Sequence, residues 1–259
     1  MDWAFTLSGL VVGFIVGLTG VGAGALMTPL LVLVFGVSPA VAVGTDLLYA
    51  AITKSVGAWV HGRRGNVDWS MVCWLAAGSI PAALLTVAGL KTLGVESGQF
   101  SVLITTAMGG VLVLTAAALV FKERLRFGRS PGRHAATWSE RYRIPATLVT
   151  GAMLGALVTL TSVGAGALGM VALFALYSRL PAATLVGSDI AHAVPLTLVA
   201  GLGHAALLGT VDYPMLASLL MGSLPGIYLG SHAAGTVPES LLRGVLAAVL
   251  FLVAGRLLW

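Results

Sequence analysis

Long apolar segments constrain this chain more than any other feature of its sequence. Eight of them are long enough to cross a bilayer, which takes about 20 apolar residues in an α-helix. They cover residues 5–35, 41–60, 69–90, 99–121, 145–177, 182–208, 213–233 and 241–259. A β-barrel would instead show short strands of alternating polarity. The sequence therefore predicts an all-α, multi-pass membrane protein.

Charged residues are too few to cover a soluble fold. Asp, Glu, Lys and Arg make up 9% of the 259 residues, whereas soluble domains carry about 25%. The formal net charge of +5 lies between the apolar segments, so it does not indicate a nucleic-acid partner. Membrane lipids are the expected surroundings. The single cysteine excludes an intrachain disulfide and a cysteine metal cluster.

Two of the segments are longer than one crossing, and each contains a glycine-rich interruption. Residues 19–24 read Thr-Gly-Val-Gly-Ala-Gly, and residues 161–166 read Thr-Ser-Val-Gly-Ala-Gly. Alternating glycines disfavour a continuous helix. Non-helical backbone at membrane depth is tolerated only where it is buried in protein or lines a cavity. We therefore expect each break to lie inside the protein.

The two interruptions belong to an internal duplication. Val-Gly-Ala-Gly-Ala-Leu at 21–26 recurs at 163–168, which is 142 residues later. Gly-Thr-Asp at 44–46 returns as Gly-Ser-Asp at 187–189, and further matches follow in order with a drift of one or two residues. Paired interrupted segments in corresponding halves point to a transporter and to its binding site.

The duplication divides the chain into a first transmembrane repeat (1–121), a basic linker (122–144) and a second repeat (145–259). Each repeat is expected to hold one interrupted segment and three transmembrane helices. The linker carries seven Lys or Arg residues, which favours the cytoplasm. The 61–68 loop is basic as well, but its counterpart at 204–212 has no Lys or Arg. This asymmetry favours inverted repeats, with parallel repeats as the alternative.

Several short motifs resemble those of a known family. They are Gly-Leu-Thr-Gly-Val-Gly-Ala-Gly at 17–24, Val-Gly-Thr-Asp-Leu-Leu at 43–48, Thr-Lys-Ser-Val-Gly-Ala at 53–58 and Gly-Asn-Val-Asp-Trp at 65–69. Together they are similar to the TauE/SafE sulfite exporter family of bacterial membrane proteins. The second half repeats the pattern in weaker form, so the resemblance covers nearly the whole chain.

The resemblance implies a secondary transporter in the bacterial inner membrane that exports a sulfur-containing anion. The substrate would be sulfite or an organosulfonate such as sulfoacetate. A proton gradient or the membrane potential would drive its transport. An anion channel or an importer on the same scaffold is the alternative. An enzyme is disfavoured, because neither His-Glu-x-x-His nor Gly-x-Ser-x-Gly occurs. No cofactor is indicated, and a homodimer is left open.

The glycine-rich interruptions supply most of the expected substrate-binding residues. Each precedes a helix, so free backbone N–H groups and a helix N-terminus attract anions there. The alternative is close packing of helices through small residues. The expected binding residues are Thr19, Gly20, Gly22, Gly24, Thr161, Ser162, Gly164 and Gly166.

Ionisable residues within the apolar segments supply the remaining candidates, because such groups are costly in a membrane. Lys54 is expected to bind substrate, since its repeat partner is the neutral Thr197. Its alternative is a structural or snorkelling lysine. Asp46, Asp189, His192 and His204 are expected in coupling or gating. Helix capping is the alternative for the aspartates, and an interfacial position is the alternative for His204.

Overall fold

The computed structural model describes residues 2–19, 24–94, 98–127, 140–233 and 239–258. Within these ranges all regular structure is helical, as the sequence predicts. The elements are α1 (Trp3–Thr19), α2 (Gly24–Leu33), α3 (Pro39–Arg63), α4 (Trp69–Leu93), α5 (Gly98–Phe127), α6 (Glu140–Thr161), α7 (Ala167–Leu176), α8 (Ala182–Gly203), a π-helical turn η1 (His204–Leu208), α9 (Tyr213–Ala233) and α10 (Glu239–Leu258).

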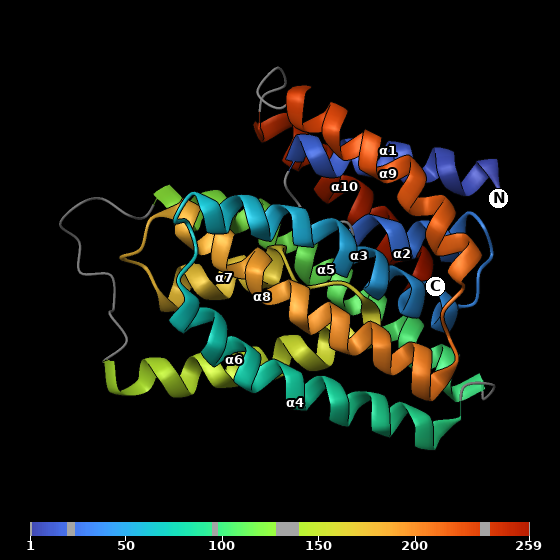
Figure 1. The fold of residues 1–259 in the computed structure, drawn as a ribbon, viewed down its shortest axis with the longest axis horizontal. Helices are drawn as coiled ribbons and strands as arrows, with labels where there is room; N and C mark the ends of the chain where they lie inside the picture. The colour runs from blue at the N-terminus through green and yellow to red at the C-terminus, as the bar shows by residue number, and fades with distance from the viewer. Residues whose placement is uncertain (1, 20–23, 95–97, 128–139, 234–238, 259) are drawn as a thin grey trace.

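Two helix pairs, α1 with α9 and α4 with α6, form the outer flanks of the molecule (Figure 1). Glycines allow the backbones to approach closely in both pairs. A Cβ built on Gly13 of α1 would lie 2.8 Å from the Cα of Ser223 on α9. A Cβ on Gly155 of α6 would lie 2.8 Å from the Cα of Ser79 on α4. This close packing recurs at equivalent positions of the two halves.

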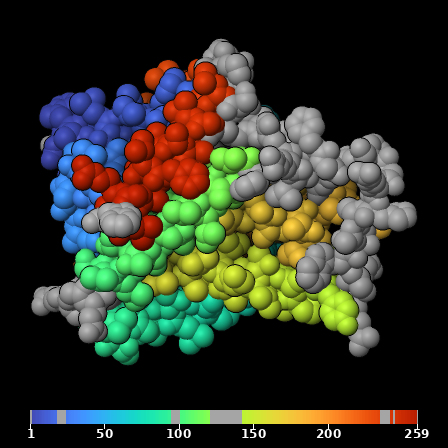
Figure 2. All heavy atoms as spheres, turned by 180° about the vertical axis from the view of Figure 1, so that it is seen from behind, coloured from blue at the N-terminus to red at the C-terminus, as the bar shows by residue number. Residues whose placement is uncertain are grey.

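Helices α3 and α8 cross the centre of the molecule side by side and run in opposite directions (Figure 1). Two glycine contacts fix this antiparallel register. Gly57 of α3 lies against Ile190, and Gly201 of α8 lies against Leu48. The third pair of corresponding helices, α5 and α10, lies together on the opposite face, where Figure 2 shows them in green and red.

Reciprocal hydrogen bonds join the two halves at both ends of the central helices. The amide of Asp212 donates to Thr45 Oγ1 at 3.0 Å, and the amide of Asp68 donates to Ser188 Oγ at 2.9 Å. Each aspartate also caps the helix that follows it, by accepting a hydrogen bond from a backbone amide three residues later. The hydroxyl partners, Thr45 and Ser188, occupy corresponding positions in the duplicated sequence.

The second long apolar segment is interrupted where the sequence predicts. Residues 5–35 give α1 and α2, and residues 145–177 give α6 and α7. The first break falls on 20–23, outside the described residues, whereas the second break at 162–166 is described. Helix α5 continues to Phe127, and helix α6 begins at Glu140. Both ends therefore lie within residues 122–144, the interval assigned to the linker from the sequence.

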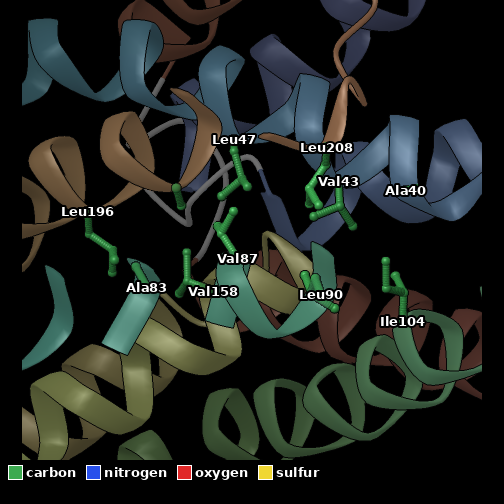
Figure 3. Packing of buried hydrophobic residues seen from close by; sticks show 11 residues of the cluster. Ala40, Val43, Leu47, Ala83, Val87, Leu90, Ile104, Val158, Leu196 and Leu208 are labelled. Atoms are coloured by element: carbon green, nitrogen blue, oxygen red, sulfur yellow. The ribbon is translucent and has the colours of Figure 1, made fainter. Parts of the chain in front are cut away.

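Apolar packing encloses the second break. One cluster fills the space between α3, α8 and α4, with Leu47, Val87, Leu196 and their neighbours pointing toward one another (Figure 3). Ala165 of the break packs against this cluster, and Val163 belongs to a second cluster between α5 and α10. The non-helical backbone is therefore surrounded by protein, which satisfies the condition for such backbone at membrane depth.

The outer surface suits a hydrocarbon environment. Four helical stretches are long and apolar enough to cross a membrane by length and composition: Trp69–Leu93, Ser101–Val120, Tyr142–Thr161 and Ala182–Leu208. Large apolar side chains also face outward on α1, α4, α9 and α10. These features identify a multi-pass membrane protein.

Candidate functional site

The second glycine-rich break adopts a backbone that only glycine takes up readily. Gly164 and Gly166 have φ angles of 121° and 135°, and Ser162 also has a positive φ, of 57°. A Cβ on Gly164 would meet no atom closer than 3.7 Å, so close helix packing does not explain this glycine. The Thr161 hydroxyl holds the turn by donating to Leu157 O at 2.7 Å and accepting from the Val163 amide at 3.1 Å. The glycines therefore serve the shape of the break.

Unpaired backbone donors gather where the break meets α7. Within the described part of the chain, the backbone amides of residues 164–167 donate no hydrogen bond. Gly169 and Met170, by contrast, donate to Gly164 O at 3.2 Å and to Gly166 O at 3.0 Å. Free N–H groups and the positive end of the helix dipole make such a turn attractive to anions. The Ser162 hydroxyl is buried there without a hydrogen-bond partner.

Lys54 reaches this break from the other half of the chain. Its ammonium group donates to the carbonyl oxygen of Ala165 at 3.0 Å, although 111 residues separate the two. The side chain is half-buried, and its charge acts on Asp189 most strongly and on Asp46 next. The structure therefore brings three expected functional elements together: the lysine, the second break and the two aspartates.

Asp46 is fully buried on α3 and receives a hydroxyl donor. Thr28 of α2 donates from Oγ1 to Asp46 Oδ2. Ser162 Oγ lies beside the same carboxyl group without forming a hydrogen bond of good geometry. Asp46 lies about two turns after the start of α3 at Pro39, so it does not cap that helix.

Asp189 occupies the equivalent position on α8 but lacks such a donor. It is 3% exposed, and its Oδ1 has no hydrogen-bond partner among the described residues. The carboxyl group packs directly against Gly169 of α7, where an added Cβ would overlap Oδ1. It too lies about two turns inside its helix, which begins at Ala182, and so does not act as a cap.

The two histidines of α8 and η1 differ in how their ring nitrogens are used. His192 Nε2 is paired with Ser79 Oγ at 2.8 Å, while Nδ1 is buried without a partner. His204 uses both nitrogens, with Thr210 Oγ1 at 2.9 Å and Thr159 O at 3.1 Å. His204 is fully buried within the protein and supports the π-helical end of the helix.

The first break remains the part of the candidate site without a described geometry. Thr19 is the last residue of α1 and Gly24 the first of α2, while Gly20 and Gly22 lie outside the described residues. The expected roles of these four residues therefore stay predictions.

Sequence reasoning did not single out three partners of the site: Thr28, Ser79 and Gly169. The first two donate or accept hydrogen bonds at buried ionisable groups, and the third makes room for a carboxyl group. Polar Thr28 within the apolar helix α2 is a signal that could have found the first of them, because buried hydroxyls require partners.

Long apolar helices and a polar site buried between two halves define a multi-pass membrane transporter. The chain belongs to the TauE/SafE sulfite exporter family, whose profile, described as "Sulfite exporter TauE/SafE", matches residues 5–257.

The similarity to known relatives covers nearly the whole chain. It is 39% identical over 255 residues to the probable membrane transporter protein YjnA of Bacillus subtilis (strain 168), with 98% of both chains covered. It is 28% identical over 257 residues to a probable membrane transporter protein of Xylella fastidiosa (strain 9a5c), with 97% of this chain and 93% of the relative covered. No solved structure matches the chain significantly.

Proposed function

We propose that this protein is a secondary transporter that exports a small sulfur-containing anion, such as sulfite or sulfoacetate, from the cytoplasm. The observation that carries the proposal is the contact between Lys54 and the second break. An ammonium group, unpaired amides and a helix N-terminus lie at the same break, and each of them favours an anion. The family name supports a sulfur oxyanion as the substrate class.

Lys54 has a partner in the described structure that an anion can replace. The carbonyl of Ala165 accepts its hydrogen bond, but a neutral carbonyl does not cancel a charge within the membrane. An oxyanion at residues 164–167 would pair with the ammonium group and accept from the free amides. Binding there therefore replaces weak partners with strong ones.

We also propose that the two repeats are inverted, with residues 122–144 in the cytoplasm and the protein in the bacterial inner membrane. The antiparallel course of α3 and α8 and the reciprocal hydrogen bonds of Thr45 and Ser188 support this arrangement. Inverted repeats place the substrate site between the halves, near the middle of the membrane.

Flux into and out of proteoliposomes tests the proposed function. We expect saturable counter-transport of labelled sulfite or sulfoacetate that exceeds transport of sulfate or taurine. Lys54→Met should abolish it, whereas Lys91→Met, at the exposed end of α4, should retain it. Flux that does not saturate and shows no counter-transport would indicate a channel. Absence of flux for every anion would reject the proposal.

A further inference from the structure

The buried site holds an unequal number of acidic and basic groups. Asp46 and Asp189 occupy corresponding positions on α3 and α8, but among the described residues Lys54 is the one Lys or Arg that acts on them. Its repeat partner is the neutral Thr197. An ionised carboxylate that is buried without partners costs several kcal/mol. One ammonium group therefore leaves a charge imbalance that a bound anion would increase.

Other groups around Asp189 do not correct this imbalance. His192 lies on the same helix, and His61 of α3 packs beside Gly187, about half a turn from Asp189. The neighbouring groups seen on α4 and α7 are neutral: Ser79 pairs with His192, and Gly169 lies against the Asp189 carboxyl group. Lys54 of α3 is thus the charged group that acts on Asp189 among the described residues.

The two aspartates differ in their hydrogen-bond donors. Asp46 accepts from Thr28 and has Ser162 beside it, and such donors favour the ionised form. The residue of α7 that corresponds to Thr28 is Met170, which has no hydroxyl. Asp189 therefore has no comparable donor within the described structure, and its buried Oδ1 is free to carry a proton. The duplication has kept both acids but equipped only one of them to remain charged.

From this asymmetry we infer that Asp189 binds the proton that is coupled to anion transport, and that Lys54 links the two binding events. The inference rests on the proposed function, because it requires an anion at the second break. An anion that pairs with Lys54 takes up the positive charge that otherwise acts on Asp189. The carboxylate then takes up one proton, supplied by hydronium or the buffer acid of the solution, and becomes neutral. Protonation in turn leaves Lys54 available to the anion, because coupling between two ligands is reciprocal.

Anion affinity measured against pH tests this linkage in the full-length detergent-purified protein. Sulfoacetate is the probe, since its charge is constant between about pH 6 and pH 9, well above the titration of a free carboxyl group. If one proton accompanies the anion, affinity falls by up to about tenfold for each unit of rising pH. Asp189→Asn, which resembles the protonated acid in shape, should bind with little dependence on pH. The matched variant Asp46→Asn should retain the slope.

A proton count in the wild-type protein needs no variant. Titration calorimetry in two buffers of different ionisation enthalpy should give an uptake of about one proton per bound sulfoacetate at the pH where the slope is steepest. Zero uptake, or a slope that survives in Asp189→Asn or disappears in Asp46→Asn, would overturn the inference. Binding without pH dependence rejects the inference alone, whereas no binding of any sulfur-containing anion at any pH rejects the proposed function.

Discussion

Glycine-to-alanine substitutions provide a direct test of the helix pairs that flank the site. A Cβ at Gly155 or at Gly13 would lie 2.8 Å from the Cα of Ser79 or of Ser223, and still closer to the carbonyl oxygen of the same residue. The obstructing atoms are backbone, so a side-chain rotation cannot relieve the overlap. Forcing a methyl group into such a contact costs about 1–3 kcal/mol. We expect Gly155→Ala and Gly13→Ala to destabilise the protein by similar amounts.

Gly110 of α5 is the matched control, because a Cβ there would meet no atom within 4 Å. Alanine stabilises a helix interior by roughly 0.5–1 kcal/mol relative to glycine, so Gly110→Ala should stabilise the protein. Equilibrium unfolding in mixed SDS micelles measures all three variants on one scale. The expected difference between Gly110→Ala and either flank variant is about 1.5–4 kcal/mol. Equal stability of the three variants would refute the packing of α1 on α9 and of α6 on α4.

Three further predictions concern the site and the topology. Lys54→Met should weaken binding of a dianion more than binding of a monoanion, and equal loss for both would make the lysine structural. Gly169→Ala should displace the Asp189 carboxyl group, with an unfolding penalty of about 0.5–1.5 kcal/mol, and unchanged stability and anion affinity would contradict that contact. In a chain without Cys73, Trp69→Cys and Tyr213→Cys mark exposed, corresponding positions. Inverted repeats predict that an impermeant thiol reagent labels only Tyr213→Cys in intact cells, whereas labelling of both or of neither supports parallel repeats.

Local features of the sequence were sufficient to predict the helical architecture and the second interruption. Apolar length predicts a membrane helix because the bilayer fixes the number of residues needed. Alternating glycines predict the break at 162–166, where positive φ angles are now seen at Gly164 and Gly166. Charge was a poorer guide to the ends of α5 and α6. Lys, Glu and Arg are good helix formers, so a polar stretch does not by itself end a helix.

Contacts between distant segments could not be predicted from local features. Thr28 binds Asp46, Ser79 binds His192, and Lys54 binds the Ala165 carbonyl, yet none of these pairs is close in sequence. The duplication indicated that the halves correspond, but not which face of one half meets the other. Titratable side chains in one apolar segment likewise predicted similar roles for His192 and His204, which the structure separates by their free and occupied ring nitrogens.

The duplication has a consequence for the transport cycle if the repeats are inverted. Two identical inverted repeats would give inward- and outward-facing states related by symmetry, and hence equal in free energy. The scaffold of this chain is close to that limit, because Gly13 and Gly155 make matching contacts. The site departs from that limit, because Lys54 corresponds to Thr197 and Thr28 corresponds to Met170. These unmatched side chains make the two states unequal, so an anion at Lys54 and a proton at Asp189 act on a balance that the sequence has already shifted.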